Sequence, residues 1–494
     1  MMAARETAAT GIPGLDDILD GGFTRDRVFL VEGVPGSGKT TLGLQFLMQG
    51  AAAGEPVLYV TLSETENEIR GVADSHGWSL DGIEICDLTP SEGALSPEDQ
   101  NTLFHPSELE LAETSKRILE DVERLKPKRL VLDSLSELKM LAGNALRYRR
   151  HILALKQLFA TRACTVLLLD DVTVADRDLQ MQSIAHGVVL LEQLYPDYGV
   201  ERRRVRVVKY RGVRFRGGNH DYVIRTGGLR VFPRLVAAEH RHTTSRRRRA
   251  SGVEELDALM GGGIEEGTST LIVGSAGTGK STLAAQFLAS AAAEGVRGAI
   301  FMFDESPQTL LTRCAEIGID LEPHVAKGVV TLQQVDPAEL TPGELTHSMK
   351  DAVTNGARIV VVDSLNGYLN AMPGERFLTI QLHELLAYLS QQGVATILIG
   401  AHQGMIGTQM HTPIDASYLA DAVVMLRYFE ARGEVRQAIS VVKKRGGRHE
   451  RTIREFRLDS GGIKVGEALR QFRGVLTGVP TYEGGPAPLL EAKR

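Results

Sequence analysis

The stretch Gly33-Val34-Pro35-Gly36-Ser37-Gly38-Lys39-Thr40 recurs in a second form as Gly274-Ser275-Ala276-Gly277-Thr278-Gly279-Lys280-Ser281. Both segments fit the pattern G-x-x-x-x-G-K-[ST] without a mismatch. In this pattern the glycines let backbone N–H groups wrap around phosphates, and the N-terminus of the following helix faces the anion. The lysine reaches the outer phosphates, and the last hydroxyl can ligate Mg²⁺. The sequence therefore predicts two nucleoside triphosphate sites.

The residues expected to bind nucleotide are the glycines, the lysine and the hydroxyl side chains of each loop. In the first loop they are Gly33, Gly36, Ser37, Gly38, Lys39, Thr40 and Thr41. In the second loop they are Gly274, Gly277, Thr278, Gly279, Lys280, Ser281 and Thr282. The cofactors predicted from these loops are ATP and Mg²⁺.

The duplication extends well beyond the two loops. The segment Thr10–Asp16 precedes the first loop by the same interval as Ser251–Asp257 precedes the second, and Leu130–Leu135 corresponds to Val360–Leu365. Internal repetition of this kind indicates two tandem copies of one domain. We place the copies at residues 1–235 and 251–470, with a basic linker at 236–250 and a C-terminal tail at 471–494.

Each copy alternates between strand and helix patterns. Short apolar strands are expected at Val28–Glu32 and Ser269–Val273, directly before the loops. The runs that end at Asp133 and Asp363 are almost uninterrupted apolar, which is typical of strands covered on both faces. The alternation predicts an α/β fold with a mostly parallel sheet flanked by helices in each copy. The phosphate loops should then lie at the carboxyl edge of the sheet.

Composition narrows the class of protein. The formal net charge is −6 and the pI is about 6.2, which argues against a dedicated nucleic-acid binder. The run Arg246–Arg249 has no aromatic neighbours, so a solvated linker is favoured over a nucleic-acid contact. Three cysteines without C-x-x-C spacing indicate a reducing compartment. No signal peptide is recognised and no apolar run approaches ~18 residues, so we expect a cytoplasmic protein without membrane contact.

Several predicted strands end at or just before acidic residues, and hydrolysis of ATP would depend on those acidic residues. Asp133 and Asp363 end apolar strands and are expected to hold the metal together with Thr40 and Ser281. Glu64 in the first copy, and Asp304 with Glu305 in the second, follow the strand after each loop helix. A carboxylate there could accept a proton from water or a hydroxyl near the γ-phosphate. Glu64, Asp304 and Glu305, with Lys39 and Lys280, are the predicted catalytic residues.

With these motifs collected, the chain resembles the KaiC family of RecA-like ATPases, which includes a circadian clock ATPase. The resemblance also rests on Val208–Gly212 and Val442–Gly446, which share the pattern Lys-x-Arg-Gly, and on Arg427–Glu434. It implies two RecA-like domains in a homohexamer with nucleotides between neighbouring subunits. It further implies an ATPase in the first domain, an autokinase in the second, and regulators of the KaiA or KaiB kind.

The resemblance assigns roles to further residues. Lys209 and Arg211, and likewise Lys443 and Arg445, would reach the γ-phosphate bound to the adjacent subunit. Ser417 and Tyr418 stand where the family carries its phosphoacceptor serine and threonine, and Thr412 is a weaker candidate.

The chain departs from the family pattern at the first acidic position. The family has two adjacent glutamates at each acidic strand end, whereas this chain has Ser63 before Glu64 and Asp304 before Glu305. Serine is no base at neutral pH, so Glu64 would have to activate water in the first domain. Two other functions stay open: a DNA-dependent RecA-like ATPase, and a nucleotide-gated scaffold without kinase activity.

Overall fold

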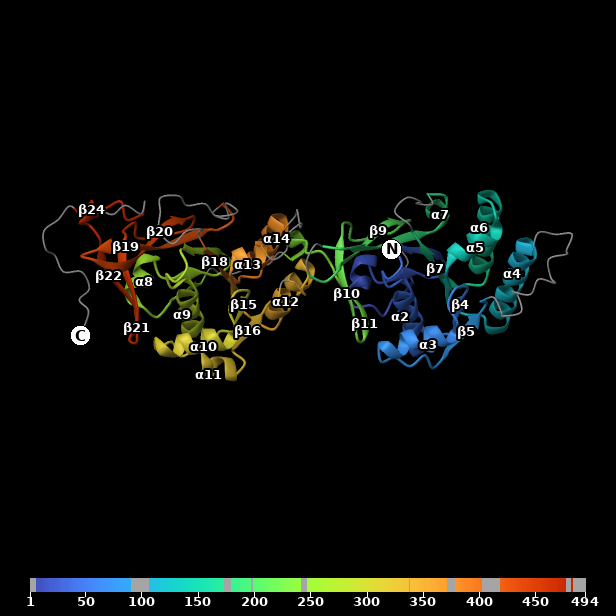
Figure 1. The fold of residues 1–494 in the computed structure, drawn as a ribbon, viewed down its shortest axis with the longest axis horizontal. Coiled ribbons are helices and arrows are strands. Elements are labelled where there is room, and N and C mark those ends of the chain that lie inside the picture. Colours follow the sequence, from blue (N-terminus) through green and yellow to red (C-terminus); the bar gives the residue numbers. More distant parts are fainter. Residues whose placement is uncertain are drawn as a thin grey trace, which may run out of the picture. The chain divides into compact units, whose positions relative to one another are not determined.

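The computed structural model describes residues 6–89, 106–172, 179–196, 199–240, 247–336, 338–370, 378–401, 418–476 and 481–482. The chain forms two compact units, Met1–Arg234 and Leu235–Arg494 (Figure 1). None of the described helices is long and apolar enough to cross a lipid bilayer.

The first unit is built on a nine-stranded sheet with the order β11-β10-β9-β8-β3-β7-β6-β4-β5. Strands β8 to β5 in that order run parallel, and β9, β10 and β11 add an antiparallel extension. The strands are β3 (Val28–Gly33), β4 (Val57–Thr61), β5 (Ile83–Asp87), β6 (Arg129–Asp133), β7 (Thr165–Asp171), β8 (Gly187–Leu194), β9 (Arg202–Tyr210), β10 (His220–Arg225) and β11 (Gly228–Phe232), with a separate pair β1 (Thr7–Ala8) and β2 (Phe23–Thr24). The helices are α1 (Leu15–Leu19), α2 (Lys39–Ala52), α3 (Glu66–Ser75), α4 (Pro106–Leu125), α5 (Leu135–Ala142), α6 (Ala145–Thr161) and α7 (Leu179–Ile184).

The second unit repeats this architecture, with the sheet order β16-β15-β17-β18-β14-β19-β20-β21-β22. Its strands are β14 (Ser269–Gly274), β15 (Gly298–Met302), β16 (Val330–Gln334), β17 (Ile359–Asp363), β18 (Ala395–Ala401), β19 (Ala422–Ala431), β20 (Glu434–Lys444), β21 (Arg454–Asp459) and β22 (Gly462–Ala468), with the pairs β12 (Arg248–Arg249) and β13 (Ile264–Glu265), and β23 (Phe472–Arg473) and β24 (Thr481–Tyr482). The helices are η3 (Ala237–His240), α8 (Glu254–Leu259), α9 (Lys280–Ala293), α10 (Pro307–Glu316), α11 (Glu322–Ala326), α12 (Pro342–Thr354), α13 (Leu365–Asn370) and α14 (Leu378–Gln391). The matching strand orders confirm the predicted fold class for both copies.

Successive residues of the central strands enter two separate cores. Phe29 and Val31 of β3 pack with α2, whereas Leu30 packs with α4, α5 and α6, which lie side by side (Figure 1). In the second unit Ile272 packs with α9, and Leu271 packs with α12 and α14. Alternate side chains of a strand point to opposite faces, so a sheet covered by helices on both faces requires nearly continuous apolar strands.

The segment between the two copies is partly built into the second unit. Leu235 and Ala237 belong to the core around α14, and the N–H of Ala237 donates to Glu384 at 3.2 Å. Further on, Arg249 forms an ion pair with Glu266, and Arg248 donates to the carbonyl of Gly261 at 2.7 Å. These two arginines of the basic run therefore have partners inside the protein.

Candidate nucleotide sites

Each phosphate loop links a central strand to the helix beside it. The loops begin at the last residues of β3 and β14, and the helices begin at Lys39 and Lys280. The preceding glycines, Gly38 and Gly279, have φ of 88° and 90°, a left-handed conformation that favours glycine. Backbone N–H groups at the start of a helix attract anions. Both loops therefore have the local geometry that a phosphate group requires.

The two loop lysines are buried against their own loops. Lys39 Nζ donates to the carbonyls of Gly33 at 3.0 Å and Val34 at 3.1 Å. Lys280 Nζ donates to the carbonyl of Ser275 at 2.8 Å, and its burial lowers the pKa of its ammonium group. Lys39 also has a charged partner, Asp171, at 2.6 Å. Lys280 hydrogen-bonds a neutral carbonyl, which compensates a buried ammonium poorly, so a phosphate oxygen would be a favourable partner there.

A hydroxyl and a carboxylate meet in each unit where a metal ion would bind. Thr40 Oγ1 donates to Asp133 Oδ2 at 2.8 Å. In the second unit Ser281 hydrogen-bonds Asp363, whose Oδ2 is buried and has no hydrogen-bond partner among the described residues. Oxygen ligands of this kind suit Mg²⁺, so the residues present fit the ion. Thr40 and Asp133, and likewise Ser281 and Asp363, would hold the ion, which when bound would neutralise charge on the phosphates.

Burial shifts the pKa of both metal-site aspartates upward. Burial raises the pKa of Asp363 to about 6, and neighbouring Glu305 and Asp304 raise it further while Ser281 opposes the shift. Burial also raises the pKa of Asp133, against hydrogen bonds from Tyr59 and Thr40. A divalent cation would reverse these shifts because it stabilises the ionised carboxylates.

The two carboxylates of the second unit are held in different ways. Arg313 binds Glu305 through two ion-paired hydrogen bonds of 2.7 Å. Asp304 is exposed and, within the described ranges, accepts one hydrogen bond, of 2.6 Å from Ser364 Oγ, which itself accepts from Gly367 N–H. Thus Glu305 is engaged on both oxygens, whereas Asp304 keeps an oxygen for a further partner.

Glu64 of the first unit has a different environment. Its Oε2 is buried without a hydrogen-bond partner among the described residues. Burial raises the pKa of Glu64, and the nearby charge of Asp133 raises it further. Ser63, which precedes it, is exposed. Helix α3 begins directly after, because Thr65 and Glu68 form a reciprocal capping box.

The Lys-x-Arg-Gly segments lie near the amino ends of the parallel strands, at the opposite edge of the sheet from their own phosphate loops, which follow the carboxyl ends. Tyr210, between Lys209 and Arg211, pairs with Gly187, which pairs with Phe29 at the start of β3. The strand from Phe29 to Gly33 spans about 13 Å, since each residue advances about 3.3 Å. The second unit repeats this pattern, because Lys444 pairs with Ala422 and Ala422 with Thr270.

Within one subunit these cations hold the turn before the adjacent strand. Lys209 Nζ donates to the carbonyls of Gln182 at 2.6 Å and Ala185 at 2.8 Å, and Arg211 donates to that of Ser183 at 2.6 Å. In the second unit Lys443 donates to Ala420 O at 2.8 Å, and Arg445 to Tyr418 O at 2.7 Å.

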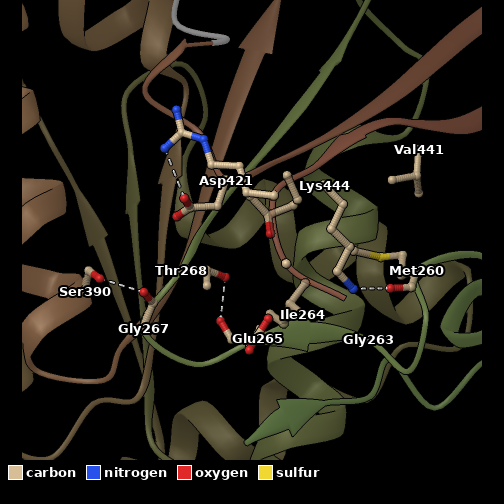
Figure 2. A pocket seen from close by; sticks show the side chains of 14 residues that line it. Met260, Gly263, Ile264, Glu265, Gly267, Thr268, Ser390, Asp421, Val441 and Lys444 are labelled. Carbon is tan, nitrogen blue, oxygen red and sulfur yellow. Dashed lines mark hydrogen bonds and ion pairs between the residues drawn. The ribbon is translucent and has the colours of Figure 1, made fainter. Parts of the chain in front are cut away.

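A cavity of about 350 Å³ opens at this same edge of the second unit, away from the phosphate loop. Figure 2 shows Asp421 and Lys444 on one side of it, with Glu265, Thr268 and Ser390 opposite. Arg445, which forms an ion pair with Asp421 at 3.3 Å, also lines the cavity. The edge that carries Arg445 is therefore hollowed and polar.

Comparison with known proteins identifies the family. A family model described as "ATPase: KaiC" matches residues 8–236 and 250–470. The chain belongs to the KaiC family of ATPases. It is 29% identical to the circadian clock protein KaiC3 of Synechocystis sp., over 97% of this chain and 95% of that protein. It is 28% identical to the circadian clock oscillator protein KaiC of Synechococcus elongatus, over 96% of this chain and 91% of that protein.

Some residues of this KaiC-family chain that matter to the sites were not predicted from sequence. Tyr59 donates to Asp133 at 2.6 Å, Asp171 binds Lys39, and Arg313 and Ser364 hold the two acids of the second unit. The position of Asp171 at the carboxyl end of a central strand was the available signal. Ser417 and Thr412 lie outside the described residues, and Tyr418 is 53% exposed.

Proposed function

We propose that this KaiC-family ATPase works as a homohexameric ring that binds Mg-ATP in both units, hydrolyses it, and phosphorylates itself in the second unit. The observation that best supports this proposal is the position of the Lys-x-Arg-Gly segments. Their cations lie at the sheet edge opposite their own loops, so phosphate contacts by Arg211 and Arg445 require a neighbouring copy. A repeated head-to-tail interface whose rotation closes gives a ring.

A signalling or timing role follows from such a ring, because two nucleotide sites per subunit give it distinct conformational states. The three cysteines, Cys86, Cys164 and Cys314, are buried and form no disulfide, which supports a cytoplasmic location. Regulators of the KaiA or KaiB kind would distinguish those states. A DNA-dependent motor is disfavoured because Arg248 and Arg249 are already bound within the second unit.

Nucleotide content tests the independence of the two sites. Lys280→Ala should empty the second unit and leave the first loaded, since the polar partners of Lys39 among the described residues are its own loop and Asp171. Native mass spectrometry in Mg-ADP would then count about half of the parent's nucleotide. Lys39→Ala is the matched control and should give the converse pattern. Loss of both nucleotides from either variant would contradict two independent sites, and a strict monomer with bound nucleotide would contradict the ring.

Autophosphorylation is the second test. After incubation with Mg-ATP we expect phosphate on Ser417, because it offers an aliphatic hydroxyl directly before Tyr418, whose carbonyl contacts Arg445. Phosphopeptide mass spectrometry should find no phosphate on Ser417→Ala, while Thr412→Ala and Tyr418→Phe keep it. Phosphate on Tyr418 alone would place the acceptor one residue later. ATP hydrolysis without any phosphopeptide would leave an ATPase ring that is no kinase.

A further inference from the structure

The two phosphate loops differ in one neighbouring residue. In the first unit the loop glycine Gly33 pairs across β3 and β7 with Asp171. In the second unit Gly274 pairs across β14 and β18 with Ala401. The strands are equivalent, so one loop has a carboxylate at a position where the other has a methyl group.

Asp171 contacts the loop lysine directly. Its Oδ1 lies 2.6 Å from Lys39 Nζ. The lysine side chain is 7% exposed and the aspartate side chain is 39% exposed, so the pair stands at the mouth of the loop. Lys280 has no carboxylate within ion-pair distance among the described residues. Within the described part of the chain, Lys39 is therefore the loop lysine that is ion-paired with a protein carboxylate, whereas Lys280 is influenced by Asp363 and Asp304 at longer range.

Further carboxylates surround this pair. Burial is the main cause of the raised pKa of Glu64, and the charge of Asp171 contributes to it after Asp133 and Glu68. Behind Asp171 lies Asp170, where burial raises the pKa to about 7. Asp170 is 7% exposed, accepts from Ser136 Oγ at 3.2 Å, and pairs across the strands with Glu32. Several carboxylates thus lie near Lys39, and they offset part of the positive charge that would stabilise a third phosphate.

The loop lysine of this motif reaches the β- and γ-phosphates. A γ-phosphate on Lys39 would bring its negative charge beside Asp171, and like charges in a partly buried site repel strongly. A diphosphate ends one group earlier, so its charge lies farther from Asp171. The penalty is therefore larger for a triphosphate than for a diphosphate.

We propose that Asp171 is a specificity-determining residue that competes with the terminal phosphate for Lys39 and lowers the preference of the first unit for nucleoside triphosphate over diphosphate. The second unit, with Ala401, lacks this restraint. This inference rests on the proposed nucleotide binding. It gives the first unit a stronger tendency to retain diphosphate after hydrolysis, and so to turn over slowly.

Paired affinities test the inference. In a Lys280→Ala chain, we would measure Kd for Mg-ADP and for the Mg complex of the non-hydrolysable triphosphate AMPPNP, by competition with fluorescent methylanthraniloyl-ADP. Asp171→Asn should raise the triphosphate-to-diphosphate affinity ratio about tenfold, which corresponds to ~1.4 kcal/mol. The reciprocal Ala401→Asp, in a Lys39→Ala chain, should lower the ratio of the second unit by a similar factor. Asp74→Asn, which removes an exposed carboxylate of α3 in the same unit, is the matched control and should leave the ratio unchanged.

Each other outcome has a definite meaning. Ratios within twofold of the parent for both Asp171→Asn and Ala401→Asp would overturn the inference. Equal loss of both nucleotides from Asp171→Asn would also overturn it, because Asp171 would then support the loop rather than select the ligand. A Lys280→Ala parent that binds neither nucleotide would instead contradict the proposed function.

Discussion

Asp304→Asn is expected to lower ATP turnover by the second unit about 10²–10⁴-fold, the range usual for loss of a general base. The reason is the unequal engagement of the two neighbouring acids. Glu305 is bound on both oxygens by Arg313, whereas Asp304 is exposed and, among the residues that the structure describes, accepts from Ser364 only. Asp304 is therefore the carboxylate available to take a proton. Turnover would be measured in a Lys39→Ala chain, so that only the second unit contributes.

Variants of the supporting residues sharpen this test. Ser364→Ala should cost less than Asp304→Asn, because it leaves the carboxylate but removes the hydrogen bond that orients it. Glu316→Gln removes an exposed carboxylate of α10 and should leave turnover unchanged. If Glu305→Gln abolished turnover while Asp304→Asn did not, the ion pair with Arg313 would not prevent Glu305 from acting as the base.

Arg445→Ala should slow phosphoryl transfer in the second unit by about 10³-fold or more, as when a cation supplied in trans is lost from a GTPase. Binding of ATP should persist, since the loop at Lys280 lies at the other sheet edge. The measurement is turnover above that of a Lys280→Ala ring, with nucleotide content determined in parallel. Arg448→Ala, which removes an exposed arginine nearby, is the matched control.

Mixed rings separate action in trans from a structural defect. An Arg445→Ala chain keeps its loop lysine, and a Lys280→Ala chain keeps its arginine, so some interfaces between them combine both intact residues. Turnover should recover in mixed rings verified by native mass spectrometry. Absence of recovery there would mean that Arg445 acts through the turn it holds at Tyr418, within its own subunit.

The sequence alone predicted the features that depend on local pattern. The loops at Gly33 and Gly274 could be read directly, because a phosphate cradle requires glycines and a lysine at fixed spacing. Strands β6 and β17 were predicted to end at Asp133 and Asp363, and they do, since uninterrupted apolar runs mark strands buried on both faces. Repetition along the chain then implied two copies of one fold.

Only the tertiary structure decided which side chains meet at each site. Asp171 reaches Lys39 because β3 and β7, remote in sequence, are neighbours in the sheet. Arg313 binds Glu305 because helix α10 turns its side chain back toward the end of the preceding strand. The pattern of acidic residues could not rank Asp304 against Glu305, since adjacent carboxylates differ in chemistry only through their partners. The distance between two charged side chains depends on strand order and register. A local motif therefore predicts that a phosphate binds to Lys39, whereas the fold determines that the Asp171 carboxylate competes with that phosphate.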